Sequence, residues 1–159
     1  MKLVEELPPP LNFEKLKKEV LELIDRHGNP RQIGLQSLDL NKEEWAIEDG
    51  RPIVKDTEYR YLHNSLKGSS IADLIDSLSA FRARIMIMQP RTCYSIHADT
   101  TKRIHIPIVT DPQAWMVWPH HNTCKHLQAG KTYLTDTTKL HSFFNGSTVN
   151  RIHLVLGVL

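Results

Sequence analysis

Apolar residues recur at helical spacing in two stretches of the first half of the chain. Between residues 13 and 27 they form one stripe, and Gly28-Asn29-Pro30 then stops the pattern. A period of three to four residues predicts an amphipathic helix there. A second helix is expected to open with the capping-type sequence Ser70-Ile-Ala-Asp73. The buried faces of the two helices would consist of Phe13, Leu16, Val20, Leu23 and Ile24, and of Leu74, Ile75 and Leu78, respectively.

From Phe81 onward, short strand-like runs alternate with turn signals such as Asp111-Pro112, Gly130 and Asn145-Gly146. Strands are predicted near residues 82–89, 94–98, 103–109, 114–118, 131–136, 142–145 and 150–158. Before them, residues 32–38 and 51–54 are expected to be extended, with a turn at Asp49-Gly50. Two helices followed by about seven short strands predict a β-barrel or jelly roll with the helices packed outside.

Two of these strands share an unusual alternation. In the run 103–108 the even-numbered residues are all Ile, and the first two odd-numbered residues are Arg103 and His105. The run 151–156 repeats the pattern, with Arg151 and His153 at the early odd positions. An apolar face packs against a covering layer, and the Arg-x-His face is either exposed to solvent or lines a polar cavity. Its presence on two strands favours a shared cavity.

The composition fits one domain of 159 residues, with 40% hydrophobic and 24% charged residues. A net charge of +2 gives no reason to expect a nucleic-acid partner. No apolar run approaches the roughly 18 residues of a membrane span, and the acidic start Met1-Lys-Leu-Val-Glu-Glu is unlike a signal peptide. Cys93 and Cys124 form no disulfide framework and are expected to be small buried hydrophobes, so a reduced cytoplasmic setting is the default.

The chemistry-bearing pattern begins with His97-Ala-Asp99. On an extended segment, residues i and i+2 point the same way, so His97 and Asp99 can reach one ion. The pair alone is weak, because it arises easily by chance. His141 can add a third ligand, and two imidazoles with one carboxylate suit a non-haem Fe(II) that activates oxygen. Arg151 would then be a fixed cation for a carboxylate-bearing co-substrate such as 2-oxoglutarate.

With these residues assembled, the region 81–159 resembles the aspartyl/asparaginyl β-hydroxylase family of Fe(II)/2-oxoglutarate oxygenases, which includes bacterial free-proline hydroxylases. The matching segments are Arg82-Ala-Arg-Ile-Met, His97-x-Asp99, Arg103-Ile-His-Ile-Pro-Ile-Val-Thr110, Ala129-Gly130-Lys131 with Asp136, His141 with Asn145, and Arg151-Ile-His-Leu-Val155.

The resemblance implies a double-stranded β-helix over residues 81–159, supported by a mixed helical region over residues 1–80 within a single domain. It implies Fe(II) held by His97, Asp99 and His141, with Arg151 at the far carboxylate of 2-oxoglutarate. Arg103 and His105 match positions that contact the co-substrate nearer the metal, although a substrate role is possible.

The resemblance also implies an activity. The enzyme would hydroxylate an amino acid, a peptide or an amino-acid-like small molecule with O2, releasing succinate and CO2. The animal enzymes of the family have Gly where this chain has Asp99, so the chain sides with the bacterial amino-acid hydroxylases. The particular substrate, whether it is free or part of a protein, and the oligomeric state stay open.

Several other residues carry weaker predictions. His120 and His121 are expected to be exposed loop histidines, and Asp136 and Asn145 to bond backbone around the His141 turn. His153 lines the cavity or is a core histidine, with equal support. Within residues 58–64, Tyr59, Tyr61 and His63 are candidates for lining the substrate entrance, with a surface loop as the alternative.

Three other functions compete with the hydroxylase. A cupin-type metalloenzyme that uses no 2-oxoglutarate would share the architecture, because fold does not fix function. A non-catalytic β-barrel would hold a ligand in the same cavity without turnover. A nucleic-acid demethylase is least favoured, because such dioxygenases carry a second Arg after the co-substrate Arg, and this chain has Gly157 at that position.

Overall fold

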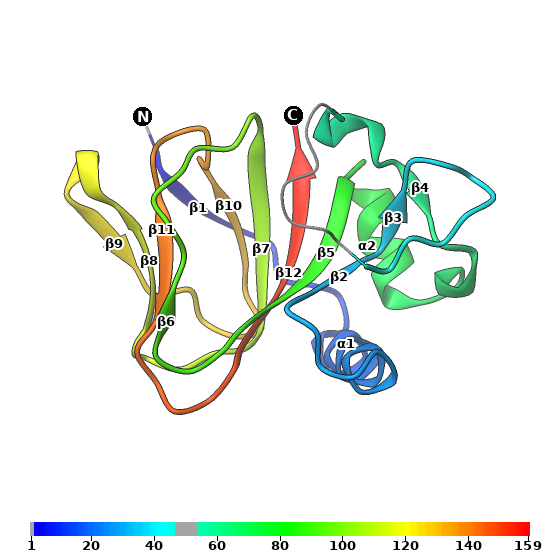
Figure 1. The fold of residues 1–159 in the computed structure, drawn as a ribbon, viewed down its shortest axis with the longest axis horizontal. Coiled ribbons are helices and arrows are strands. Elements are labelled where there is room, and N and C mark those ends of the chain that lie inside the picture. Colours follow the sequence, from blue (N-terminus) through cyan, green and yellow to red (C-terminus); the bar gives the residue numbers. More distant parts are fainter. Residues whose placement is uncertain (1, 47–53) are drawn as a thin grey trace.

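Two antiparallel sheets face each other in the computed structural model, which describes residues 2–46 and 54–159 (Figure 1). Within these residues the larger sheet has the order β1 (Val4–Leu7), β10 (Thr132–Thr135), β7 (Lys102–Val109), β12 (Arg151–Val158), β5 (Phe81–Met88) and β2 (Gln32–Gly34). The smaller sheet has the order β6 (Thr92–Cys93), β11 (Ser142–Asn145), β8 (Ala114–Trp118) and β9 (Thr123–Lys125). A further short pair joins β3 (Gln36–Ser37) to β4 (Tyr61–Leu62). The fold is the predicted double-stranded β-helix.

The two α-helices lie on the outer face of the larger sheet, away from the smaller one (Figure 1). Helix α1 (Phe13–Arg26) starts at Asn12, whose side chain accepts a hydrogen bond from the backbone N–H of Lys15. Such a cap satisfies one of the amides that a helix start leaves without a partner. Short 3-10 turns occupy Asp56–Glu58 (η1), Asn64–Leu66 (η2) and Pro119–His121 (η3).

The apolar stripe of α1 is the predicted one, with Leu16, Val20, Leu23 and Ile24 buried. Helix α2 (Ser70–Ser77) differs slightly from the prediction. Its cap is Ser69, which accepts from the backbone N–H of Ala72, and its buried residues are Ile71, Ala72 and Ile75. Leu74 and Leu78 pack only at the margin of the core. Ile71, Leu74, Ile75 and Leu78 still lie on one stripe, and its N-terminal part is the more deeply buried.

The main core lies between the helices and the outer face of the larger sheet. The even-numbered residues of β7 from Ile104 onward and those of β12 belong to it, and the register places Leu154 opposite Ile106 and Leu156 opposite Ile104. Ile106 and Leu154 are both fully buried. Burying each such side chain contributes about 1.5–3 kcal/mol of stability. Because successive residues alternate faces, this packing directs the odd-numbered residues of both strands into the space between the two sheets.

The strand predictions are confirmed for β5, β7, β8, β10, β11 and β12 to within one residue at most ends. The predicted strand at 94–98 is wrong in its extent: the described strand is Thr92–Cys93, and only His97 makes a further β-bridge, with His141. The run 32–38 breaks at Leu35, whose amide bonds instead to the carbonyl of Ala83. The expected turn at 49–50 and most of the extended segment 51–54 lie outside the described residues.

The prediction that Cys93 and Cys124 are buried is wrong, since both side chains are exposed. Cys93 lies on β6 and Cys124 on β9, the two edge strands of the smaller sheet. Edge strands of this sheet have no covering layer, so a small apolar residue there stays in contact with solvent.

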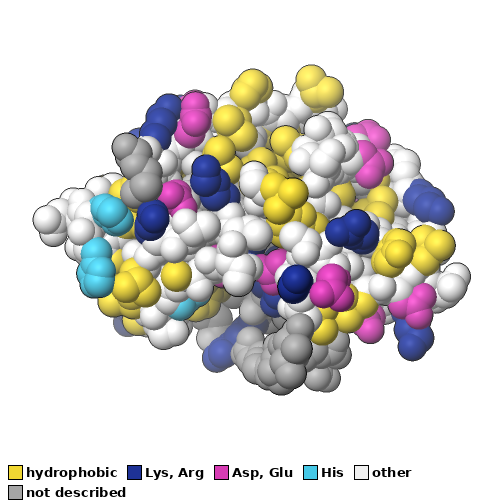
Figure 2. Space-filling model, turned by 90° about the horizontal axis from the view of Figure 1, so that it is seen from above, with side chains coloured by type: hydrophobic (Ala, Val, Ile, Leu, Met, Phe, Trp, Pro, Cys, Tyr) yellow, Lys and Arg dark blue, Asp and Glu magenta, His cyan; other side chains and the backbone are white. Residues whose placement is uncertain are grey.

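The surface carries mixed charge. Seen from above, Lys/Arg and Asp/Glu side chains are interspersed among polar and apolar ones (Figure 2). No helix among the described residues is long and apolar enough to cross a membrane.

Candidate metal centre

His97 and His141 face each other across a single antiparallel bridge between two distant segments. The backbone N–H of His97 donates to the carbonyl of His141 at 3.0 Å, and the N–H of His141 donates back at 2.9 Å. Directly opposed residues in such a pair project their side chains to the same side, and the two ring centroids lie 4.5 Å apart. Ligand atoms of His97, Asp99 and His141 all lie within 4.8 Å of one another. We call these three residues the metal triad.

Both imidazoles of the metal triad are oriented in the same way. The Nδ1 atom of His97 lies 2.8 Å from the carbonyl oxygen of Ser95, and Nδ1 of His141 lies 2.9 Å from that of Lys139. A carbonyl only accepts, so each Nδ1 carries the hydrogen and each Nε2 keeps its lone pair. Burial lowers the pKa of His141, which favours the neutral form that binds metals.

The carboxylate of the metal triad is held by an arginine. The backbone N–H of Asp99 donates to the carbonyl of Thr137 at 2.8 Å, and Oδ2 of Asp99 lies 3.4 Å from Nε of Arg103. Arg103 also pairs with Asp56, which in turn pairs with Arg82. Burial opposes ionisation of Asp56, but the two guanidinium groups outweigh it and lower its pKa. Alternating acidic and basic side chains therefore connect η1 to the metal triad.

Arg151 is the most unusual group of the site, because it is 1% exposed yet incompletely paired. Within the described residues, its Nε and Nη1 atoms are buried and have no hydrogen-bond partner. The guanidinium lies 4.3 Å from the ring centroid of Phe143. Burial lowers the pKa of Arg151 to about 10, while Tyr94 acts in the opposite direction. Buried cations are normally paired, so this geometry fits an anionic ligand.

His105 and His153 form a buried pair beside Arg151. Their Nδ1 atoms lie 3.3 Å apart, so one ring donates and the other accepts. Burial, followed by the nearby Arg151, lowers both pKa values well below the ordinary range. His153 is fully buried and does not line the cavity, so it is a core histidine that supports His105.

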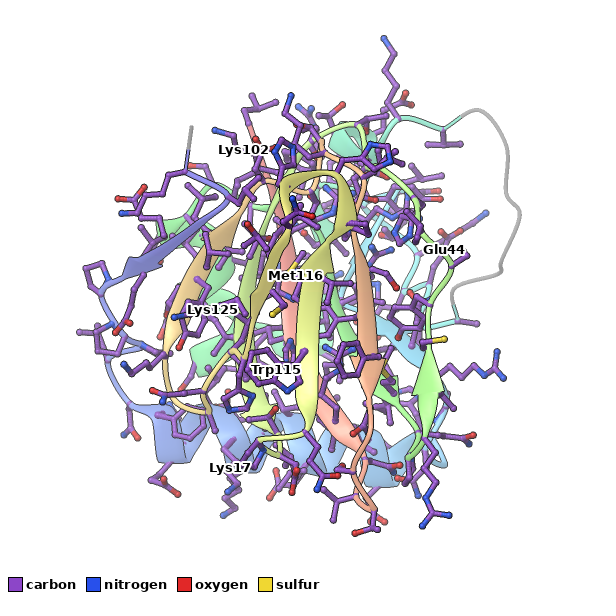
Figure 3. The ribbon with its side chains drawn as sticks, turned by 90° about the vertical axis from the view of Figure 1, so that its left-hand side faces the viewer. Lys17, Glu44, Lys102, Trp115, Met116 and Lys125 are labelled. Atoms are coloured by element: carbon purple, nitrogen blue, oxygen red, sulfur yellow. The ribbon has the colours of Figure 1, made fainter. Side chains whose placement is uncertain are left out.

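One cavity between the sheets joins these groups. Its floor is on β5, β7 and β12 of the larger sheet, and its roof is on β8 and β11 of the smaller one. Met116, on β8, lines it from the roof, and Figure 3 shows this strand from the outside of the smaller sheet. The lining residues are Arg84, Met86, Tyr94, His97, Asp99, Arg103, His105, Met116, Thr137, His141, Phe143, Arg151 and Val155.

The structure thus brings together all six residues that the sequence singled out for the site. They are His97, Asp99, His141, Arg103, His105 and Arg151. The donor set, two neutral imidazoles and one carboxylate, fits Fe(II). The buried, incompletely paired Arg151 fits a dicarboxylate such as 2-oxoglutarate.

Other predicted residues lie elsewhere. Tyr59, Tyr61 and His63 do not line this cavity. Tyr61 is exposed, and His63 is buried against Trp45, with ring centroids 4.3 Å apart. His120 and His121 are exposed in η3, as expected.

The two residues expected to bond backbone do so. Asp136 accepts hydrogen bonds from the backbone N–H and the hydroxyl of Thr138. Asn145 donates to the carbonyls of Met88, Gln89 and Val149.

Three residues of the site had no predicted role: Asp56, Arg84 and Tyr94. Arg84 carried a sequence signal, since it is a cation beside the apolar run Ile85–Met88 and belongs to the segment that resembles the family. Asp56 carried none, because its importance comes from pairing with arginines on two distant strands.

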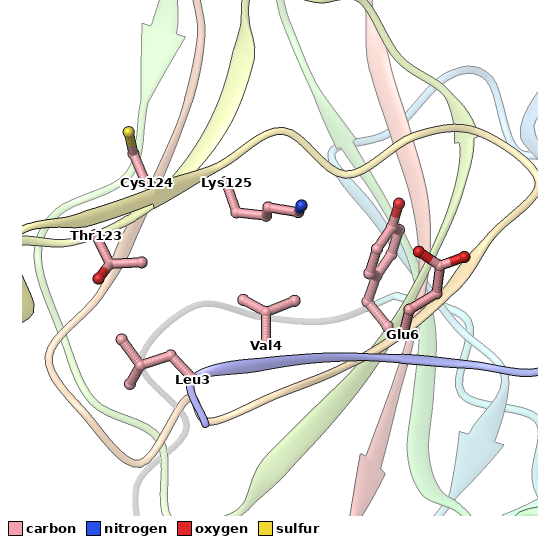
Figure 4. Close-up of a pocket in the computed structure, with 7 residues that line it drawn as sticks. Leu3, Val4, Glu6, Thr123, Cys124 and Lys125 are labelled. Carbon is pink, nitrogen blue, oxygen red and sulfur yellow. The ribbon is translucent and has the colours of Figure 1, made fainter. Parts of the chain in front are cut away.

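A separate cavity lies at the other side of the sandwich, between β1 and β9 (Figure 4). Leu3, Val4, Thr123 and Lys125 are among its lining residues, and it contains no residue of the metal triad. Because Lys125 lies outside the metal cavity, its substitution can serve as a control for the loss of a positive charge.

Two facing antiparallel sheets with this donor set between them define the class of protein, the double-stranded β-helix fold of 2-oxoglutarate/Fe(II) oxygenases. The chain belongs to the aspartyl/asparaginyl β-hydroxylase family, whose sequence profile matches residues 11–159. A comparison with curated proteins found no significant match by sequence.

Solved structures share the fold at low sequence identity. The viral collagen prolyl hydroxylase of Paramecium bursaria Chlorella virus-1, in its 2-oxoglutarate complex, is 12% identical with a TM-score of 0.57, over 99% of this chain and 97% of that one. A prolyl-4-hydroxylase of Pseudomonas putida is 11% identical with a TM-score of 0.56, over 99% and 93%. A 2OG-Fe(II) oxygenase family oxidoreductase of Burkholderia pseudomallei is 14% identical with a TM-score of 0.52, over 98% and 83%.

Proposed function

We propose that this protein is an Fe(II)- and 2-oxoglutarate-dependent hydroxylase of an amino acid, a peptide or an amino-acid-like small molecule. One observation carries the proposal: a buried arginine without a full set of partners lines the same cavity as two histidines and an aspartate with metal-ligand geometry. A metal site alone fits many reactions, and the arginine narrows them to those with an anionic co-substrate.

The metal triad would hold the iron. Bound there, Fe(II) would supply the activation of O2: 2-oxoglutarate would lose CO2 and take up one oxygen atom to give succinate, and the other oxygen atom would enter a C–H bond of the substrate. The protein's part is to fix the ligands. The carbonyls of Ser95 and Lys139 fix the two imidazole tautomers, and Arg103 holds Asp99.

Arg151 would bind the far carboxylate of 2-oxoglutarate. Its planar fork pairs bidentately with a carboxylate and stays charged when buried. Phe143 below the guanidinium fixes its plane, and the surrounding burial keeps water away and strengthens the ion pair. Arg103 and His105 are the proposed contacts near the metal, with Arg103 acting first as the group that positions Asp99.

The substrate class rests on the family and on Asp99. The resemblance to bacterial amino-acid hydroxylases includes this carboxylate. Two of the similar structures are, by their names, a collagen prolyl hydroxylase and a prolyl-4-hydroxylase. An amino acid, free or within a peptide, is therefore the proposed substrate.

Arg151 weighs against a cupin-type enzyme without 2-oxoglutarate. A non-catalytic barrel that holds a ligand would show no succinate release in the assay below. The nucleic-acid demethylase is disfavoured on a physical ground as well. A Cβ atom at Gly157 would lie 2.5 Å from Cε2 of Phe81 and 2.9 Å from its carbonyl oxygen. A second arginine therefore does not fit at this position.

The test is succinate release from 2-oxoglutarate under air, with Fe(II) added. We expect iron-dependent release in the wild type, and we expect Arg151→Met to raise the KM for 2-oxoglutarate about 100-fold, as for the loss of a charged bidentate pair. Lys125→Met removes a cation from the separate cavity and should change nothing. Release that does not depend on iron, or an unchanged KM in Arg151→Met, would refute the proposal.

A further inference from the structure

An open groove leads from the surface to the metal cavity. It runs between the β2–β5 edge of the larger sheet and the segment 92–97, and it encloses about 530 Å³. That is within the usual size of a small-molecule site. The groove and the metal cavity share four lining residues, Arg84, Met86, Tyr94 and His97. A molecule lying in the groove therefore has one end beside a ligand of the metal triad.

Arg84 lies at the junction of the groove and the cavity. It is on β5, opposite Val155 of β12. Its Nε atom is buried, and among residues 2–46 and 54–159 Arg84 makes no hydrogen bond or ion pair. Burial lowers its pKa to about 10, and the neighbouring cations Arg103 and Arg82 act in the same direction, while the carboxylates of Asp99 and Asp56 act in the opposite one. Arg84 is thus a half-buried cation that no carboxylate among the described residues contacts directly.

The other arginines of the site have partners or a proposed one. Arg82 and Arg103 share the carboxylate of Asp56, and Arg103 also contacts Asp99. Arg151 has the proposed co-substrate. Iron(II) and doubly charged 2-oxoglutarate neutralise each other, so their binding would supply no direct partner for Arg84. An anion is still missing on the groove side.

Arg82 shows why the two neighbouring arginines of β5 differ. Arg82 has a positive φ of 46°, and the pairing of β5 with β12 shifts register between Val155 and Gly157. A shift of this kind re-aims a side chain. Arg82 bonds to Asp56, while Arg84, after the irregularity, lines the cavity.

We propose that Arg84 binds a carboxylate of the substrate, so that the enzyme acts on a compound with a free carboxylate and an aliphatic body. Met86, which lines both the groove and the metal cavity, fits the aliphatic part. The reacting carbon then lies towards His97. This inference rests on the proposed hydroxylase function. The carboxylate belongs to the main chain of a free amino acid or to an acidic side chain in a peptide.

The first arm of the test is turnover. Free amino acids, their methyl esters, and N-acetylated peptide amides with an internal Asp or Glu are screened for stimulation of succinate release. We expect stimulation by free acids or by acidic peptides, and none by the matched ester, or by peptides with Asn or Gln in that position. Stimulation by an ester as strong as by its acid would overturn the proposal. Whether free amino acids or acidic peptides stimulate succinate release identifies the source of the carboxylate.

The second arm compares variants. Arg84→Met should raise the KM for the stimulating acid about 10- to 100-fold, while the KM for 2-oxoglutarate stays within about two-fold. Arg84→Lys keeps the charge but not the fork, and should retain part of the affinity. Lys125→Met is the control. If Arg84→Met instead weakens 2-oxoglutarate and leaves the acid unaffected, the proposal is wrong. Thermal melts establish that each variant folds. If Arg84→Met does not fold, Arg84→Lys is compared with the wild type instead.

A third arm separates this proposal from the proposed function. The metal-free protein is titrated calorimetrically with L-proline, L-leucine and L-aspartate and their methyl esters, and with the acidic peptide amides and the methyl esters of their side chains. Binding of an acid but not of its ester, lost in Arg84→Met, supports the carboxylate site even if no turnover is found. Equal behaviour of acid and ester, or of wild type and Arg84→Met, overturns it even if the enzyme turns over 2-oxoglutarate.

Discussion

In β7 and β12 the two faces of the larger sheet are both buried, but they differ in how completely their polar atoms are hydrogen-bonded. On the helix side, Ile106 and Leu154 are 0% exposed and contact only apolar neighbours of the core. On the cavity side, one residue away along the same strand, His153 is 0% and Arg151 1% exposed, and both keep buried nitrogen atoms without partners among the described residues. One face stabilises the fold, and the other carries a cost that ligands can relieve.

This comparison teaches where to look for function in a strand that is buried on both sides. Burial alone does not distinguish the two faces. The polar atoms without partners do, since those of β12, on Arg151 and His153, belong to the face that points away from the helices. Substitutions on the two faces should therefore affect different observables.

The largest effect is expected on the cavity side. Asp99→Ala removes the only carboxylate of the metal triad, so Fe(II) affinity should fall more than about 100-fold and coupled turnover should be abolished. The free energy of unfolding of the metal-free protein should change little. Asp25→Ala, on the exposed side of α1, is the control. Metal titration calorimetry measures the affinity, and persistence of both Fe(II) binding and succinate formation would rule out the metal triad.

On the helix side the expectation is reversed. Leu154→Ala leaves a cavity in the main core and should lower the free energy of unfolding by about 2–5 kcal/mol. Chemical denaturation measures this loss. Fe(II) affinity of the folded variant should stay within about two-fold, because Leu154 faces away from the metal triad. A loss of metal affinity as large as in Asp99→Ala would show that the two faces are not separable.

A smaller effect is expected for Asp56→Asn. This change removes the carboxylate shared by Arg82 and Arg103, so Arg103 is held less firmly against Asp99. We expect Fe(II) affinity to fall up to about 10-fold, as for an outer-shell partner. Glu22→Gln, which removes a carboxylate from an exposed ion pair on α1, is the control. If the two variants bind Fe(II) with identical affinity, Asp56 does not support metal binding.

The smallest effect is a pH dependence of stability. Burial lowers the pKa of His63 to about 4, with Glu43 opposing and His27 acting in the same direction. The unfolded chain binds this proton near pH 6.5, before the folded chain does, so stability is present above that pH and is lost as the pH falls towards 4. Denaturation of the metal-free protein between pH 7 and 4.5 measures the slope. His63→Gln should flatten it in part, because His105 and His153 titrate in the same sense. An unchanged slope would contradict the account.

Much of the fold could be predicted from local pattern. The alternation in β7 and β12 predicts both the apolar core and the polar cavity, because a period of two separates the faces without any knowledge of neighbours. Two edge strands, β1 and β9, could not be predicted in this way. Val4–Leu7 and Thr123–Lys125 are short and mostly polar, and they are strands because β10 and β8 offer them backbone partners.

The residues of the site fall into the same two groups: those that local pattern predicts and those that depend on distant partners. His97, Asp99, His141 and Arg151 could be predicted from spacing and resemblance. The role of Asp56 could not, because it depends on an ion pair with side chains of β5 and β7. The wrong prediction for the two cysteines has a related cause, since burial at a sheet edge is decided by what covers it.

The central claim is that the metal triad and Arg151 complete one binding site. The most direct test is binding of 2-oxoglutarate to the Fe(II)-loaded protein without oxygen, followed by the visible charge-transfer absorption of the complex. We predict saturable binding that requires Fe(II), with the Kd raised about 100-fold in Arg151→Met and unchanged in Lys125→Met. Equal Kd values in wild type and Arg151→Met, or no iron-dependent absorption at all, would contradict the claim.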